Sequence, residues 1–458
     1  MTRCGIRKVS DVNVELHELP NGLRIFYMPE PRSGVVYMQL GTKMGMDAET
    51  SQRLYESAHA IEHMVAAMTS KRHPDARKMS QEMDVRGISS NAFTSRDSVR
   101  YYLKGLKEHA DWMLESLLAS YSEPHMDTKV FPQEMHSIEQ ELRSDISDTW
   151  HDLETKMYAV LFKGMPAAVT TRKRLANVKH FTPSFLRKLA SAWYEPQLVQ
   201  LYLSGDVSSR HLRKAKVALA KHRAGRERPP ECKTVPRPWG TDFSVPIKDG
   251  GSNAGLRVIF PIELGQHDYT KKVIGDFIES VLAGGFSSRL YKILRTKLGL
   301  VYSVQVSFVT SPNPANSYVM VSTECGSKDI VKTVQGIYAE CKKLGVQGPS
   351  SYEMRKWKNV VKMDSATDAL TQDPAEYVGD YEDYLLTSNR YPSNKTLRAI
   401  SLKITKAEIK AVASEAFTKQ FMVFHTGRNS ASSGIRKIMS PPKKSRRRTS
   451  SKKLFASC

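Results

Sequence analysis

The sequence predicts an α+β fold of two similar halves, each a mixed or antiparallel sheet covered by helices. Residues 1–224 alternate short β-rich runs with amphipathic helical stretches, such as Lys107–Ser122 and Thr182–Tyr194. A segment rich in Pro and Gly between Ala224 and Asn253 then marks a linker. Beyond the linker, the mixture of elements returns.

Two short sequence runs in the first half are similar to runs in the second half. The run Gly22-Leu-Arg-Ile-Phe is similar to Gly255-Leu-Arg-Val-Ile-Phe. The run His59-Ala-Ile-Glu-His can likewise be laid beside Asp276-Phe-Ile-Glu-Ser. Matches this short arise by chance about as readily as by duplication. The second half lacks a His pair, so it cannot supply a metal site of the kind described below.

We therefore divide the chain into four parts. Residues 1–224 are predicted to form a first domain, 225–253 a linker, 254–430 a second domain and 431–458 a basic disordered tail. The run from Lys443 to Lys453 holds seven positive charges and no acid, with Ser and Pro around it, which is typical of disorder. This run could bind nucleic acid or an acidic partner, or simply act as a solubilising tail.

The composition is that of a globular protein with an unusual excess of positive charge. The 458 residues carry a net charge of +22, with 40% hydrophobic and 25% charged residues. No apolar run approaches the roughly 18–20 residues that cross a bilayer, so no membrane association is predicted. The basic N-terminus precedes no apolar core, which argues against a secretory signal. Five scattered cysteines favour a reducing, intracellular and cytoplasmic setting, with nuclear or mitochondrial locations less favoured.

The run His59-Ala-Ile-Glu62-His63 carries two candidate metal ligands and a candidate base. The surrounding stretch, Leu54–Met68, has no Pro or Gly and is predicted to be helical. His59 and His63, four residues apart, would lie on one helix face, close enough to bind one ion. Glu62 would lie at the edge of that face. On these residues alone, a surface helix with solvated His and Glu side chains explains the pattern equally well.

A third ligand is expected because catalytic zinc usually takes three protein ligands. A second helix is predicted to begin near Pro132, and it places Glu134 and Glu141 two turns apart on one face. We select Glu141 as the ligand and Glu134 as a carboxylate that orients a ligand histidine. Asp145, one turn beyond Glu141, is the competing choice and is predicted to be a solvated charge.

Together these motifs resemble the pitrilysin or inverzincin family of zinc metallopeptidases, which includes insulin-degrading enzyme and the mitochondrial processing peptidases. Members have His-x-x-Glu-His followed by two Glu seven apart, at a spacing close to the 77 residues between His63 and Glu141 here. The chain departs from the family at Glu56-Ser57, where Gly-Leu is usual before the motif, and at Ala67-Met68-Thr69, where Gly-Thr is usual shortly after it. Three further segments agree with the family's NGLR strand, NAxTxxD hairpin and C-terminal R…G…Y segment: Asn21–Ile25, Asn91–Asp97 and Arg295–Tyr302.

This resemblance implies an architecture and an assembly. Its members form clamshells of helix-covered sheets, one half active and one degenerate, that face each other across a chamber. The present chain would be half of such a clamshell. Short two-domain members pair to enclose the chamber, so a homodimer or a heterodimer with a family relative is expected.

The resemblance also implies a mechanism with one Zn²⁺ per chain. His59, His63 and Glu141 would hold the ion, which acidifies water. Glu62 would act as the general base and then protonate the leaving amine. Tyr302 would share the developing oxyanion by a hydrogen bond, unless it is a core aromatic in a strand.

Substrate binding is expected at two places. The strand Ser90–Thr94 would add an extended peptide to the sheet through backbone groups around Ala92, with the Asn91 side chain also available. Arg295 would bind a substrate carbonyl. This mode favours unfolded peptides over folded proteins.

The sequence therefore predicts a zinc-dependent endopeptidase that hydrolyses extended or unfolded peptides. Two alternatives stay open. A catalytically silent family subunit would serve as a scaffold, although such subunits usually lose a ligand or the base, and none is lost here. A basic nucleic-acid-associated protein would use the tail at residues 443–453.

Overall fold

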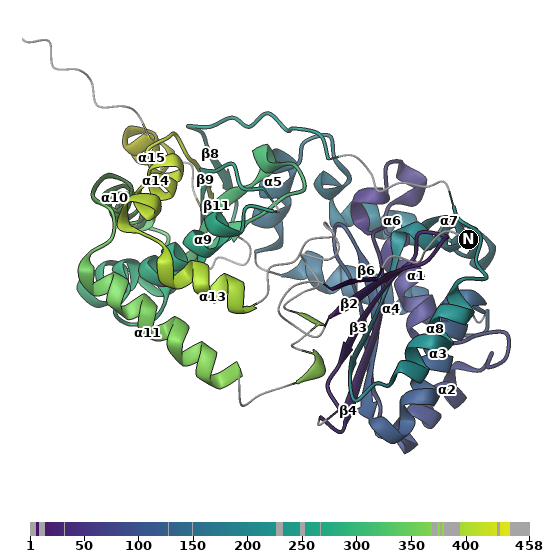
Figure 1. The fold of residues 1–458 in the computed structure, drawn as a ribbon. Helices are drawn as coiled ribbons and strands as arrows, with labels where there is room; N and C mark the ends of the chain where they lie inside the picture. The colour runs from purple at the N-terminus through teal and green to yellow at the C-terminus, as the bar shows by residue number, and fades with distance from the viewer. Residues whose placement is uncertain are drawn as a thin grey trace, which may run out of the picture.

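The computed structural model describes residues 6–8, 14–31, 33–126, 128–148, 150–225, 232–247, 252–265, 267–368, 373–375, 378–379, 394–427 and 431–439. These residues form two β-sheets that lie beside each other, each with its own covering of helices (Figure 1). The α+β architecture predicted from the sequence is confirmed.

The first sheet has seven strands in the order β1-β2-β3-β7-β4-β6-β5. The pair β3 and β7 is parallel and all other neighbours are antiparallel. Alternating burial along β6 shows one face turned to a core. The strands are β1 (Ile6–Lys8), β2 (Glu15–Glu18), β3 (Arg24–Pro29), β4 (Val35–Thr42), β5 (Ser89–Thr94), β6 (Val99–Leu106) and β7 (Val199–Gly205).

One face of this sheet is covered by helices that bury Leu, Ile and Met side chains against it. Ile61, Leu103 and Leu201, from a helix and two strands, are fully buried in this core. The helices that flank the first sheet are α1 (Ser57–Ala66), α2 (Ala76–Val85), α3 (Ala110–Ser122), α4 (Phe131–Ser147), α6 (Thr171–Val178), α7 (Pro183–Trp193) and α8 (Ser209–Leu219).

The second sheet has five strands in the order β10-β11-β9-β12-β8, with only β12 and β8 parallel. Its strands are β8 (Asp242–Val245), β9 (Asn253–Pro261), β10 (Val301–Val309), β11 (Tyr318–Gly326) and β12 (Met422–Thr426). Its helices are α9 (Tyr269–Ala283), α10 (Ile330–Gln347), α11 (Ser351–Asp368), α13 (Asn394–Lys403), α14 (Lys406–Phe417), α15 (Ser432–Met439) and the π-helical η7 (Tyr291–Lys297).

The two sheets share one topology, which confirms that the halves are similar. Strands β3 to β7 occupy the same order, with the same parallel and antiparallel neighbours, as β8 to β12. Helices α1 and α9 follow equivalent strands, β4 and β9, so the echo between His59–His63 and Asp276–Ser280 joins equivalent elements. The Gly-Leu-Arg echo does not, because it leads into β3 in the first half but lies in β9, the counterpart of β4.

Helix α5 (His151–Leu161) ties the halves together. It lies within residues 1–224, yet its apolar face packs on the second sheet, where Leu153 and Met157 contact the cluster around Phe424. Trp150 approaches Gly255 of β9 so closely that a Cβ on that glycine would come within 2.5 Å of the indole ring. An amphipathic pattern predicts such a helix without indicating which sheet it covers.

A short segment of the second half makes the reciprocal contact. Val378 is buried with Phe26 and Tyr202 on the face of the first sheet opposite the helices. The Lys104 ammonium, on β6, donates a 2.6 Å hydrogen bond to Asp373. Each half thus contributes an element to the other.

Two predicted boundaries need correction. The range 225–253, predicted as a linker, contains β8, a four-residue strand hidden by the surrounding Pro and Gly. The range 431–458, predicted as disordered, begins with α15, whose Ile435 and Met439 are buried because they share one helix face. The charged run 443–453 lies outside the described residues, and among those described no helix has the length and hydropathy to span a membrane.

Candidate active site

Helix α1 presents both motif histidines to α4. Its Ala60, Ile61 and Met64 are buried in the core, so the other face, with His59 and His63, is left half-buried. The two Nε2 atoms lie 3.1 Å apart. The i, i+4 spacing predicted this proximity.

Glu141 of α4 completes a three-residue cluster. Its Oε2 lies 3.3 Å from Nε2 of His59 and 3.6 Å from Nε2 of His63. Ligand atoms about 2.0–2.1 Å from a tetrahedral ion stand roughly 3.3 Å from one another, so the three atoms fit one zinc ion. Among the described residues, this is the one group of His, Cys, Asp or Glu close enough to hold a metal, and it leaves out Asp145.

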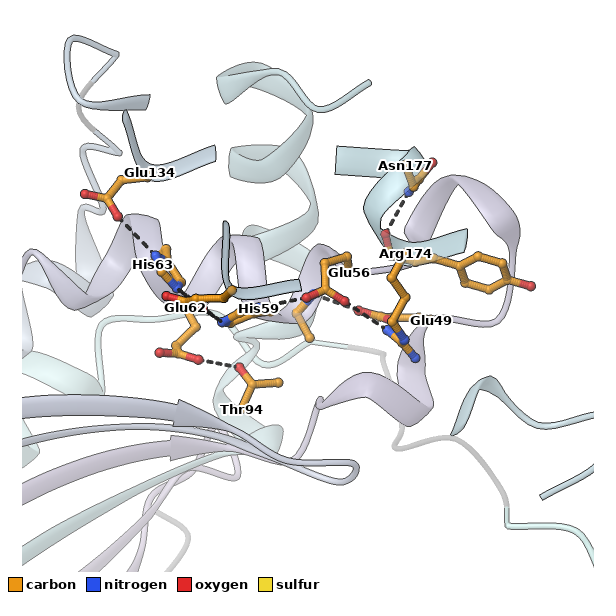
Figure 2. Close-up of polar contacts among 12 residues, drawn as sticks. Glu49, Glu56, His59, Glu62, His63, Thr94, Glu134, Arg174 and Asn177 are labelled. Atoms are coloured by element: carbon orange, nitrogen blue, oxygen red, sulfur yellow. Dashed lines mark hydrogen bonds and ion pairs between the residues drawn. The ribbon is translucent and has the colours of Figure 1, made fainter. Parts of the chain in front are cut away.

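Both histidines have their other ring nitrogen beside a carboxylate. Nδ1 of His63 lies 3.1 Å from Oε2 of Glu134, the carboxylate selected from the sequence as one that orients a ligand histidine (Figure 2). Nδ1 of His59 lies 2.7 Å from Oε1 of Glu56, a contact that the sequence did not predict. With Nδ1 protonated toward these acceptors, each Nε2 is free to bind a metal.

Glu56 also changes the electrostatics of His59. Burial disfavours the charged imidazole of His59, but the hydrogen bond and negative charge of Glu56, with the charges of Glu62 and Glu141, outweigh it and raise the pKa of His59. Behind Glu56, the Arg174 guanidinium of α6 pairs with both Glu49 and Glu56. In the sequence, the departure at Glu56-Ser57 indicated that the residues just before the motif differ from those usual in the family.

Glu62 lies beside the cluster with its carboxylate largely buried. Its Oε2 accepts a 2.8 Å hydrogen bond from the Thr94 hydroxyl at the end of β5 (Figure 2). Thr94 belongs to the strand predicted to pair with a peptide through its backbone, but no role was predicted for its side chain. The contact ties Glu62 to the strand that borders the site.

These side chains open into a cavity of about 1310 Å³. Asn91 and Ala92 of β5 line it, and β5 is the terminal strand of the first sheet. The Asn91 side chain accepts a 2.9 Å hydrogen bond from the Ala92 N–H, so part of its capacity is used locally. Within the described parts of the chain the outer edge of β5 pairs with no other strand, and such an edge beside the candidate metal site can accept an extended peptide.

Arg295 and Tyr302 lie outside the described lining of this cavity. Nη1 of Arg295 donates a 2.9 Å hydrogen bond to the Tyr302 carbonyl, and its guanidinium stacks 4.5 Å from the Tyr302 ring centre. Tyr302 is 80% exposed, so it is not a core aromatic. Neither residue is among those that line the cavity within the described chain.

Two protein-family models match this chain. A model described as insulinase, peptidase family M16, matches residues 37–173, and one described as the peptidase M16 inactive domain matches residues 180–361. The chain belongs to peptidase family M16. The first match contains the His59, His63 and Glu141 cluster, and the second contains Arg295 and Tyr302. The predicted family is confirmed.

Several M16 relatives carry the names of proteases. An uncharacterized zinc protease of Bacillus subtilis, YmxG, is 24% identical over 370 residues, 78% of this chain and 87% of that protein. The mitochondrial-processing peptidase subunit beta of Dictyostelium discoideum is 27% identical over 158 residues, 34% of this chain and 33% of its own length.

A solved structure supports the fold of this M16 chain. The crystal structure of a protease from Helicobacter pylori matches with a TM-score of 0.80 and 20% identity, over 91% of this chain and 100% of that one. At this identity the match shows a shared fold and leaves the chemistry to the residues of the site.

Proposed function

We propose that the chain is a zinc-dependent endopeptidase that cleaves extended or unfolded peptides. The observation that carries this proposal is the cluster of His59, His63 and Glu141 with Glu62 beside it, in one cavity. When bound there, one zinc ion per chain would supply Lewis acidity that acidifies water and polarises a carbonyl. The names of the M16 relatives support the same chemistry.

The chain's own groups would move the proton. Glu62 accepts it from the attacking water through the carboxylate, while the Thr94 hydroxyl holds Oε2 in place. The same carboxyl group then delivers a proton to the amine that leaves. Glu134 fixes the His63 ring during both steps.

The substrate would lie along β5. Backbone groups of Asn91 and Ala92 would pair with an extended peptide and place one peptide bond beside Glu62. Most backbone N–H and C=O groups of a folded protein are already hydrogen-bonded within that protein, which is why unfolded chains are the proposed substrates.

We further propose that Tyr302 and Arg295 act from a second copy of the chain or from a family relative. Tyr302 is exposed, Arg295 is partly exposed, and neither is among the described residues that line the cavity. A dimer that brings this surface over the cavity would supply the Tyr302 hydroxyl to a developing oxyanion and Arg295 to a substrate carbonyl.

Tyr302→Phe is expected to slow peptide cleavage by roughly 10²–10³, because one oxyanion donor is lost. Zinc content and melting temperature should not change, since the side chain is exposed and outside the metal cluster. Rate, zinc content and melting temperature are measured on one preparation. An unchanged rate would remove Tyr302 from the mechanism.

Thr94→Val is expected to lower the turnover rate about tenfold with zinc content unchanged. The substitution keeps the shape of the side chain and removes the hydroxyl that donates to Glu62. Hydrogen bonds to charged groups contribute about 1.5–3 kcal/mol, and about 1.4 kcal/mol corresponds to a factor of ten. Single-turnover kinetics check this, and a wild-type rate would show that Thr94 does not position the base.

The proposed function is tested by metal analysis of the purified full chain and by cleavage of a panel of unstructured peptides before and after chelation. We expect one zinc per chain and cleavage that chelation abolishes and zinc restores. Zinc without cleavage would favour the silent-subunit alternative.

We include a cytoplasmic, reducing location in the proposal, supported by the free thiols of Cys232, Cys325 and Cys341.

A further inference from the structure

We propose that Glu56 is a positioning residue for the metal centre, and that it does for His59 what Glu134 does for His63. This inference rests on the zinc site proposed above. Nδ1 of His59 and Oε1 of Glu56 are 2.7 Å apart, closer than the 3.1 Å between His63 and Glu134. Metal-bound histidines commonly donate their second N–H to such an acceptor, which fixes the tautomer and the ring orientation.

The backbone at Glu56 is in an unfavourable conformation. Its φ of +74° lies in the left-handed region, where glycine is favoured and a long side chain is uncommon. Strained residues of this kind persist where surrounding contacts hold them, and they gather at functional sites. Contacts of the Glu56 side chain are therefore expected to hold this strained conformation.

Helix capping does not account for Glu56. The residue precedes the first turn of α1, but its carboxylate makes no capping hydrogen bond to that helix. Glu49 takes that role instead, since its Oε1 accepts a 3.0 Å hydrogen bond from the Ala58 N–H. The Glu56 carboxylate is left to act on His59 and Arg174.

The two oxygens of Glu56 have separate partners. Oε2 lies 3.4 Å from Nη1 of Arg174, and Oε1 faces His59 (Figure 2). Arg174 is anchored in turn by Glu49 and by a 3.1 Å hydrogen bond from Nη2 to the Pro166 carbonyl. Because a buried carboxylate needs a compensating charge, the Arg174 guanidinium at Oε2 offsets the burial of Glu56, while Oε1 contacts the His59 ring.

A purely structural ion pair is the competing explanation. It would require only the contact between Glu56 and Arg174, and its loss would lower stability without a specific effect on metal binding. The positioning role instead predicts that zinc affinity changes more than stability does.

The test compares Glu56→Gly with Glu56→Gln. Glycine suits the left-handed backbone, so the variant should fold, but it offers no acceptor to His59. We expect its zinc affinity to fall 10–100-fold, as for other lost partners of metal ligands, while the metal-free melting temperature stays near the wild-type value. Glu56→Gln keeps an acceptor oxygen and should lose much less affinity.

Affinity is measured by chelator competition on the full chain, with zinc alone as the probe. Nitrogen NMR of the histidine rings in the zinc-loaded proteins adds a second measurement: wild type should show Nδ1 of His59 protonated and Nε2 bound. If Glu56→Gly does not fold, Glu56→Asn replaces it, because Asn tolerates the left-handed region and is too short to repeat the contact.

Glu353→Gln provides the matched control. Glu353 is a part-buried carboxylate paired with Arg289 in the second half, 2.7 Å from its Nε. It should lower the melting temperature and leave zinc affinity unchanged. Wild-type zinc affinity in Glu56→Gly, or an equal loss in the control, would overturn the positioning role. A wild-type chain that binds no zinc would instead overturn the proposed function.

Discussion

Glu62→Gln is expected to abolish measurable peptide cleavage while the chain keeps its zinc. The loss of a general base costs on the order of 10²–10⁴ in rate. Glu62 is not part of the cluster formed by His59, His63 and Glu141, so the metal ligands are untouched. Gln can still accept the Thr94 hydrogen bond, so the local structure should also survive.

Peptide hydrolysis and bound zinc are measured on the same preparation of Glu62→Gln. Glu139→Gln is the matched control, because Glu139 lies on α4 but does not line the cavity. Undiminished turnover by Glu62→Gln at full zinc occupancy would exclude Glu62 as the base. Lost zinc would instead show that Glu62 takes part in binding the metal.

The centre of the site was predictable because it depends on spacing within two helices. His59 and His63 share a face of α1 for geometric reasons, and the same holds for Glu134 and Glu141 on α4. The structure places all four side chains together. No knowledge of the tertiary fold was needed beyond the packing of one helix on the other.

The contacts of Glu56 and Arg174 behind His59 could not be predicted from the sequence. Arg174 is 118 residues from Glu56, and nothing in the local pattern pairs them. The left-handed backbone at Glu56 was equally hidden, because its side chain favours no such conformation. Glu56 therefore looked like a departure from the family, whereas the structure shows a contact with a candidate ligand.

Part of the fold was likewise predictable from the sequence and part was not. Alternating elements and the Pro/Gly segment predicted two similar sheets, and the shared strand order confirms them. Which sheet α5 covers depends on side-chain packing between the halves, so sequence position assigned it to the first half alone. The four residues of β8 are too few for a periodic signal.

His63→Ala is expected to remove nearly all bound zinc and, with it, all cleavage. Only His59 and Glu141 would remain as ligands, and Glu134 would lose the ring that it orients. Two ligands are fewer than the three that catalytic zinc sites use. The change lies on the half-buried face of α1, so the metal-free chain should stay folded.

Zinc content and the shift of the melting temperature with added zinc report the loss of the His63 ligand. Zinc at about 100 times its dissociation constant should stabilise the wild type by about 2.7 kcal/mol, and the variant should gain almost none of this. His136→Ala is the matched control, since His136 is an exposed histidine of α4 outside the cluster. If His63→Ala kept stoichiometric zinc, the metal would have to lie elsewhere, because removing one of three ligands from this cluster cannot leave its affinity intact.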